Sequence, residues 1–155
     1  MELKGKKVAF LGDSITEGYG ASGVDKTYWS ILGQETGAEV FGYGIGGTTI
    51  AKRNVPLPEP NPNKYFGSRV DGMIEDADII VIFGGTNDFG GSDPAFGKME
   101  VAGFYGIPVV DLFRTCPIQP RFEPQRQLLM PDGVHPNDAG HRVIARRLIS
   151  AMQAL

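Results

Sequence analysis

The stretch Lys7-Val8-Ala9-Phe10-Leu11-Gly12-Asp13-Ser14 decides the fold class. After the initial lysine it is a continuous apolar run, which is typical of a parallel strand covered on both faces. Gly12 ends the run, and the polar residues Asp13 and Ser14 follow at once. The pattern predicts a buried strand with polar side chains at its carboxyl end.

Three further segments are predicted to be strands. Residues 79–83 and 107–112 are apolar runs of the same kind, and residues 38–43 are a weaker candidate. Because these segments alternate with helical ones, the sequence predicts an α/β fold with a mostly parallel sheet. The chain has 155 residues, and residues 1–155 are expected to form one domain of ordinary size.

Apolar residues at helical spacing predict the helices. Residues 28–36 and 66–77 each carry such a stripe. The last helix is expected to start near Asn137 or Asp138, either of which can cap it, with His141 on its surface. Its predicted buried face consists of Val143, Ile144, Leu148, Ala151, Met152 and Leu155.

Polar residues cluster where the predicted strands end. Ligands in open α/β sheets bind outside the carboxyl ends of the strands, so these clusters are expected to meet in one site. Taken alone, the first cluster is better explained as a turn with helix caps, and the others could also be turns or caps, so only the four together indicate a function. The clusters are residues 12–18, 44–48, 85–88 and 132–137.

Three residues of these clusters have the chemistry of a hydrolase triad. A serine hydroxyl is a weak nucleophile and needs an adjacent base. We predict that His135 is the base for Ser14, and that Asp132, three residues earlier, holds one nitrogen of the His135 ring through a local turn. Pro136 disfavours helical geometry at His135 and so helps to fix this turn.

The same clusters offer donors for the oxyanion that forms when a serine attacks a carbonyl. The predicted oxyanion hole consists of the backbone N–H groups of Ser14 and Gly47 and the side-chain amide of Asn87. The substrate-binding residues are predicted to be Asp13, Thr48 and Asp88.

At these residues the sequence resembles the SGNH hydrolase superfamily, also called GDSL-type lipases and esterases. Gly47 matches the oxyanion glycine of the family pattern, and Asn87 matches its oxyanion asparagine. The α/β-hydrolase elbow G-x-S-x-G is absent around Ser14, which argues against that other superfamily. The four matching blocks are Gly12-Asp13-Ser14-Ile15, Gly44-Ile45-Gly46-Gly47-Thr48, Gly85-Thr86-Asn87-Asp88 and Asp132-Gly133-Val134-His135-Pro136.

The resemblance implies a flavodoxin-like three-layer sandwich and the hydrolysis of small carboxylic esters with short acyl or acetyl groups. An acylated sugar is one candidate substrate, and no metal or cofactor is implied. An acyltransferase of the same superfamily is an alternative, and so is a shortened, inactive domain that only binds a ligand or a partner chain. A metal held by Asp13, Asp88, Asp132 and His135 is a weaker alternative, because the serine would then have no role.

The chain departs from the family pattern in two places. Gly42 stands where many relatives carry an asparagine, and only 18 residues separate Asp88 from Ile107. A segment of this length holds one crossover, here with a short helix around residues 98–105, but not a helix, a strand and a second helix. We therefore expect four strands instead of five. Either the last strand pairs directly with residues 79–83, or a second chain fills the gap in a homo-oligomer.

The composition also limits the function. With 41% hydrophobic and 21% charged residues, the chain is expected to fold and not to be disordered. The formal net charge of −3 argues against nucleic-acid binding, which needs clustered Lys and Arg. The apolar run at residues 8–11 is too short for a signal or membrane segment, so we expect a cytoplasmic protein without a membrane partner.

Overall fold

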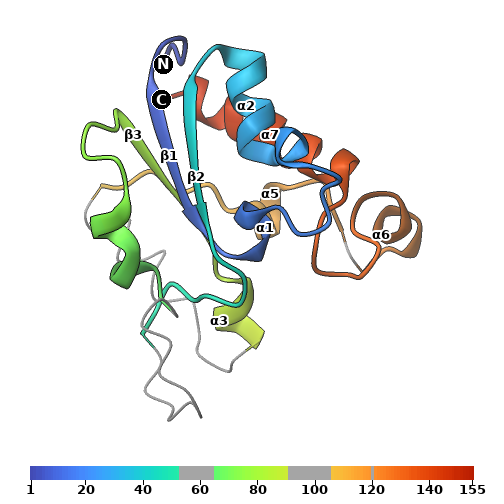
Figure 1. The fold of residues 1–155 in the computed structure, drawn as a ribbon. Helices are drawn as coiled ribbons and strands as arrows, with labels where there is room; N and C mark the ends of the chain where they lie inside the picture. The colour runs from blue at the N-terminus through green and yellow to red at the C-terminus, as the bar shows by residue number, and fades with distance from the viewer. Residues whose placement is uncertain (53–64, 91–105, 120) are drawn as a thin grey trace.

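Three parallel strands form the centre of the molecule in the computed structural model, which describes residues 1–52, 65–90, 106–119 and 121–155 (Figure 1). The strands are β1 (Lys7–Gly12), β2 (Glu39–Gly44) and β3 (Ile79–Phe83), in the order β2-β1-β3. The register pairs the last residue of β1 with the last residue of each neighbour. All three carboxyl ends therefore lie at one edge of the sheet, and the polar clusters follow from that edge.

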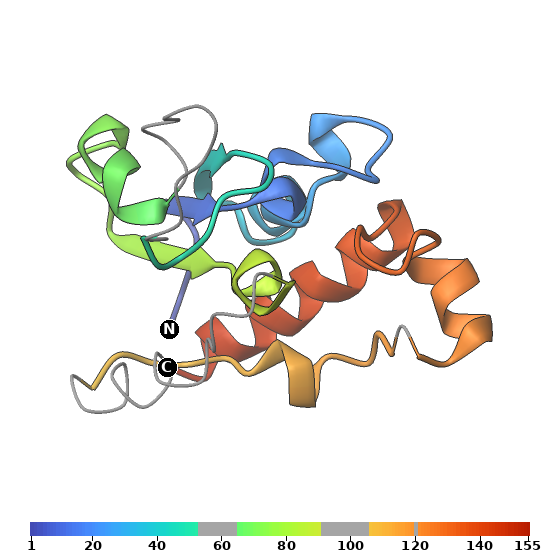
Figure 2. The same ribbon diagram turned by 90° about the horizontal axis from the view of Figure 1, so that it is seen from below.

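Helical elements cover the sheet on both faces, which gives three layers (Figures 1 and 2). The helices α2 (Tyr28–Thr36) and α7 (Asp138–Gln153) pack together on one face, against Val8 and Phe10 of β1. The 3₁₀ helix η2 (Phe66–Gly72) lies on the other face, where its Phe66 packs against the alternate residues of β1. The central strand is thus buried on both sides, as its continuous apolar sequence requires.

The remaining elements are short. The helices α1 (Ser14–Glu17) and α3 (Thr86–Gly90) follow directly after β1 and β3 and begin at the carboxyl edge of the sheet. The others are η1 (Val24–Lys26), α5 (Leu112–Thr115) and α6 (Glu123–Leu129). None of the helices in the described ranges is both long and apolar enough to cross a membrane.

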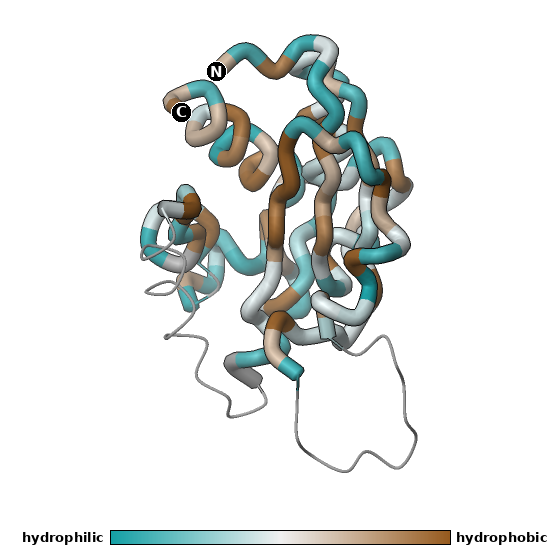
Figure 3. Tube along the Cα trace, turned by 90° about the vertical axis from the view of Figure 1, so that its left-hand side faces the viewer, coloured by the Kyte–Doolittle hydropathy of each residue, from teal (hydrophilic) through white to brown (hydrophobic). Residues whose placement is uncertain are grey.

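The predicted α/β class with a parallel sheet is confirmed. The runs at residues 7–11, 38–43 and 79–83 are strands within one residue of the predicted bounds, and β3 is hydrophobic along its whole length (Figure 3). The helix predicted at residues 28–36 is α2, which ends at Gly37 with a left-handed backbone. The short helix predicted around residues 98–105 lies outside the described residues.

The prediction of a strand at residues 107–112 is wrong, and the described part of the sheet has three strands instead of four. An apolar run becomes a strand only if a neighbouring strand accepts its hydrogen bonds. Pro108 has no N–H to offer, and the side chain of Asp111 accepts from Arg114 N–H and starts α5. Val110 still packs against the main core, but Ile107 and Val109 are exposed, so the run is neither paired nor fully buried.

The helix predicted at residues 66–77 is present only as η2, which stops at Gly72. Gly67 and Gly72 lower the helix propensity of the segment, and Met73 already has an extended backbone. Met73 is nevertheless buried, in a cluster with Phe66 beneath the sheet. Val70, which helical spacing would place on the apolar stripe predicted for residues 66–77, is instead exposed.

Two predictions for the last helix are also wrong. His141 is fully buried and not on the surface: its Nδ1 accepts from Tyr28 N–H at 3.2 Å, and its ring stacks on the Tyr28 ring. Leu155 is exposed because α7 ends at Gln153. The N-cap of α7 is Asn137, whose side chain accepts from Gly140 N–H.

Candidate active site

The first polar cluster is held tightly against the end of the sheet. The buried Asp13 accepts from Ile15 N–H at 3.0 Å through Oδ1 and so caps α1, of which Ser14 is the first residue. The end of β2 packs directly on this helix, because a Cβ on Gly44 would stand 2.0 Å from Glu17 N. Only glycine allows this approach, which fixes the loop that carries Ser14 relative to β2.

Ser14, His135 and Asp132 are brought together in a chain of hydrogen bonds. Ser14 Oγ lies 3.0 Å from His135 Nε2, and His135 Nδ1 lies 2.6 Å from Asp132 Oδ2. With the Nδ1 proton donated to Asp132, Nε2 accepts from the Ser14 hydroxyl and can take its proton. The short connection between Asp88 and Ile107 therefore does not keep these three residues apart.

Asp132 and His135 belong to one local turn. Asp132 Oδ1 accepts from Val134 N–H at 2.8 Å and from His135 N–H at 2.6 Å, which leaves Oδ2 for the His135 ring. Desolvation acts to raise the pKa of the Asp132 carboxyl, but these hydrogen bonds outweigh it and lower the pKa to about 2. Asp132 is thus ionised across the physiological range, and its carboxylate can hold the His135 ring in place through Nδ1.

The loop after α1 reaches the turn that carries the histidine. Gly20 has φ +84°, and a Cβ there would stand 2.3 Å from the carbonyl oxygen of Pro136. Next to it, the exposed ring of Tyr19 lies 5.4 Å from the His135 ring, measured between centroids. The sequence analysis did not single out these two residues, since their role depends on a contact across more than 110 positions.

The predicted oxyanion residues lie on two loops that are bonded to each other. The Asn87 amide nitrogen donates to the carbonyl oxygen of Thr48 at 2.8 Å, so the third cluster is fixed to the glycine-rich loop. Gly47 is exposed in that loop and has φ +72°, a left-handed backbone that favours glycine. Its neighbour Gly46 lies closer to the nucleophile: a Cβ on Gly46 would stand 3.7 Å from Ser14 Cβ.

The three predicted substrate-binding side chains are buried. Thr48 Oγ1 donates to Ile45 O at 2.7 Å, and Asp88 accepts from two successive backbone N–H groups, those of Ile50 and Ala51. Burial raises the pKa of Asp13 despite its bond from Ile15 N–H. These side chains support the loops around the nucleophile, and their contact with substrate stays a prediction.

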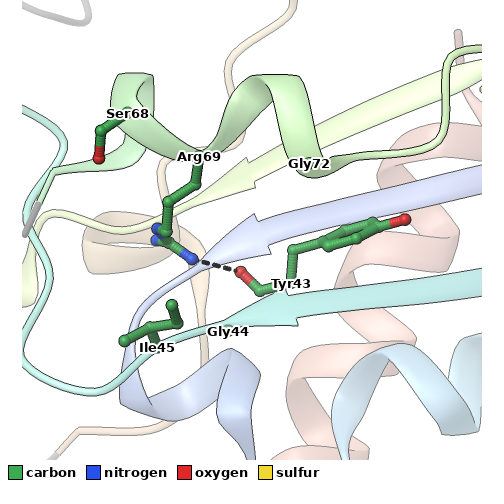
Figure 4. A pocket seen from close by; sticks show the side chains of 6 residues that line it. All are labelled: Tyr43, Gly44, Ile45, Ser68, Arg69 and Gly72. Atoms are coloured by element: carbon green, nitrogen blue, oxygen red, sulfur yellow. Dashed lines mark hydrogen bonds between the residues drawn. The ribbon is translucent and has the colours of Figure 1, made fainter. Parts of the chain in front are cut away.

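Arg69 of η2 ties the first two loops together, and the sequence analysis missed it. Its guanidinium donates to Gly12 O at 2.9 Å, to Tyr43 O at 2.8 Å and to Thr48 Oγ1 at 3.1 Å. Figure 4 shows the side chain reaching down to the ends of β1 and β2. An open pocket of about 410 Å³ lies beside it, lined by Tyr43, Gly44, Ile45, Ser68, Arg69 and Gly72.

No metal centre is evident in the described ranges, where no group of three or more His, Cys, Asp or Glu side chains is arranged to hold an ion. The acidic side chains of the site are instead used within the protein. Asp13 and Asp88 accept from backbone N–H groups, and Asp132 accepts from His135. The arrangement suits proton transfer from a serine to a histidine.

Comparison with known proteins places the chain in a family. The model of the GDSL-like lipase/acylhydrolase family matches residues 10–100, which is more than half of the chain. One crystal structure superposes with a TM-score of 0.86 at 25% sequence identity, covering 100% of this chain and 99% of the other. A Lactobacillus plantarum protein superposes with a TM-score of 0.78 at 26% identity, covering 97% and 98%.

A two-domain esterase active on acetylated mannans has the same fold over half of its length. It superposes with a TM-score of 0.69 at 20% identity, covering 98% of this chain and 50% of the esterase. No curated protein matches the chain.

Proposed function

Since the chain belongs to the GDSL-like lipase/acylhydrolase family, we propose that it is a serine esterase that hydrolyses small carboxylic esters, with Ser14 as nucleophile, His135 as base and Asp132 as the residue that orients His135. The observation that carries the proposal is the 3.0 Å separation of Ser14 Oγ from His135 Nε2, with His135 Nδ1 held by Asp132. Nucleophile and base are within the range that proton transfer needs.

The proposed reaction has two steps through an acyl-enzyme. Ser14 Oγ attacks the carbonyl carbon while its proton passes to His135 Nε2, and the protonated ring is stabilised by Asp132. The tetrahedral oxyanion is bound by Ser14 N–H, Gly47 N–H and the Asn87 amide. The carbon–oxygen bond to the alcohol then breaks, the alcohol takes the proton from His135, and water attacks the acyl-enzyme with His135 again as base.

Short acyl groups, and acetyl in the first place, are the proposed substrates. The esterase of the same fold that acts on acetylated mannans makes an acetylated sugar a reasonable first natural substrate to test. An acyltransferase would share the acyl-enzyme and differ only in the acceptor, so competition between water and added sugar for the acyl group distinguishes the two reactions.

The experiment that tests the function combines labelling and turnover. Wild-type protein is expected to react with a fluorophosphonate probe and to hydrolyse para-nitrophenyl acetate, and Ser14→Ala is expected to do neither. Ser150→Ala, at an exposed serine near the end of α7, is the matched control and should keep both activities. An unlabelled wild-type protein with an intact fold would contradict the proposal and favour a domain that only binds.

A further inference from the structure

We infer that Glu17 makes this site select against esters that carry a negative charge near the reacting carbonyl. The inference rests on the proposed esterase function and adds a residue that sets its substrate preference. It starts from the position of Glu17, which is the last residue of α1, three positions after Ser14 and therefore on the same side of the helix.

The Glu17 side chain reaches from the nucleophile helix to the glycine-rich loop. Its Oε2 accepts from Gly46 N–H at 2.5 Å, which holds the carboxylate in one place although the residue is exposed. A charge that is fixed in this way acts on a bound substrate from a constant direction.

The carboxylate lies close to the reacting atoms. A Cβ built on Gly46 would stand 3.0 Å from Glu17 Oε2, 3.7 Å from Ser14 Cβ and 3.7 Å from Tyr19 Cε2. Glu17 Oε2, Ser14 Cβ and the exposed Tyr19 ring therefore all lie within 3.7 Å of one point, so an ester bound at Ser14 lies near the Glu17 carboxylate.

The charge of Glu17 is not balanced by an ion pair in the described part of the chain. The other exposed carboxylate of the site, Asp132, is paired with His135, so Glu17 supplies the unbalanced negative charge at the surface around Ser14. Coulomb repulsion at this range opposes an anionic substrate, and dissolved salt weakens it.

The experiment compares two acetyl esters that differ by one charge, para-acetoxybenzoate and its neutral methyl ester. The measured quantity is the ratio of kcat/KM for the anionic ester to kcat/KM for the neutral ester. Repulsion between Glu17 and the oxyanion, which forms with either ester, cancels in this ratio. Glu17→Gln removes the charge and keeps an oxygen that can accept from Gly46 N–H, so the loop contact is preserved.

Glu17→Gln is expected to raise the ratio by about threefold to tenfold, which corresponds to charges roughly 8 Å apart in a mostly aqueous surrounding. The matched control is Glu39→Gln, which makes the same charge change at the exposed amino end of β2, opposite the site. It should leave the ratio unchanged. In wild-type protein the ratio should also rise with salt between about 0.01 and 0.5 M, and this dependence should be weaker in Glu17→Gln.

Equal ratios in wild-type protein and Glu17→Gln, with the neutral ester hydrolysed by both, would overturn the inference and leave the esterase function standing. An equal rise in Glu39→Gln would also overturn it, because net charge and not position would then be the cause. Failure of wild-type protein to hydrolyse the neutral ester would instead contradict the proposed function itself.

Discussion

The side-chain amide of Asn87 is oriented by the protein before a substrate arrives. It donates to Thr48 O, on the loop that also contains Gly47, so two of the proposed oxyanion donors are held in fixed relation. Donors that need no rearrangement during the reaction are the ones that stabilise developing charge most effectively.

Asn87→Ala is therefore expected to lower kcat by roughly 10²–10³, the usual loss for one oxyanion donor. KM should change little, because the lost interaction forms mainly in the transition state. Steady-state kinetics on a short-chain aryl ester measure both constants, and thermal unfolding shows whether the lost bond to Thr48 has altered the fold. A rise in KM with normal kcat would make Asn87 a substrate-binding residue.

The buried His141 makes the stability of the protein depend on pH. Burial lowers the pKa of this histidine from its usual value of 6.5, although the Tyr19 carbonyl and Asp138 act in the opposite direction. The unfolded chain therefore binds the proton more readily than the folded protein. The stabilising contribution is complete above about pH 6.5 and is lost as the pH falls below it.

The midpoint of thermal unfolding should thus fall between about pH 7 and pH 5, a range in which ordinary carboxylates change little. In His141→Asn the amide oxygen can still accept from Tyr28 N–H, but the side chain at this position no longer titrates. The variant should be less stable near neutrality and should lose less stability on acidification. A pH dependence identical to that of wild-type protein would show that another group is responsible.

At the scale of the elements, Arg69 joins η2 to the ends of two strands and to the glycine-rich loop. The guanidinium lies over the Phe66 ring of the same helix, with Arg69 Cζ 5.2 Å from the ring centroid. One side chain thus sets the distance between the loop that carries the nucleophile and the loop that carries Gly47.

Arg69→Met is expected to lower stability by about 2 kcal/mol, because the carbonyl oxygen of Tyr43 and the Thr48 hydroxyl lose a charged donor. It should also lower kcat by about tenfold to a hundredfold, as displaced catalytic groups do. Arg69→Lys should have a stability and a kcat between those of wild-type protein and Arg69→Met, since an ammonium cannot make the forked hydrogen bonds of a guanidinium. Arg146→Met, at an exposed arginine of α7, is the control and should change neither quantity.

The elements differ in how well sequence could predict them. The strands β1 and β3 were predicted because a short continuous run of apolar β-branched residues, such as Ile79-Ile80-Val81-Ile82-Phe83, favours a strand. The run at residues 107–112 has the same composition but no pairing neighbour, and composition carries no information about a neighbour. The expected burial of β3 on both faces is also wrong, because Ile80 and Ile82 are exposed, so an apolar run fixes neither the partner nor the cover that a strand receives.

The residues of the site also differ in how far the sequence alone could predict them. Ser14, His135 and Asp132 were predicted because their residue types and spacing imply a reaction. Arg69 and Gly20 were not, because an arginine or a glycine in a loop is ordinary until its distant partner is known. Their contacts join residues that lie far apart in the sequence, and such contacts follow only from the folded chain.

At the scale of the whole molecule, the sheet edge formed by β3 indicates that the protein associates with a second copy of itself. In the described residues β3 pairs only with β1. Ile80 and Ile82 of β3 lie on the same face of the sheet as η2, which covers Ala9 and Leu11 of β1, but they are themselves 56% and 60% exposed. An unpaired strand edge beside exposed apolar side chains favours pairing with another chain. We therefore expect a homodimer formed through β3.

Light scattering behind a sizing column should give about twice the 16.7 kDa mass of the chain. The double variant Ile80→Lys, Ile82→Lys should shift the protein to the monomer, because charges on an edge strand oppose pairing. Lysines at Val24 and Leu128, two exposed apolar residues outside the sheet, form the control pair. A monomer for wild-type protein over a wide concentration range would contradict the prediction.

The contact between Ser14 and His135 joins residues 121 positions apart, one just after the first strand and the other just before the last helix. Under the proposed mechanism, no fragment that lacks either end of this span can be catalytic, however native its local structure. During synthesis, activity can appear only after the segment around His135 has left the ribosome and docked. Ester hydrolysis is therefore a stringent reporter of refolding, and its recovery should lag behind the return of helical circular dichroism.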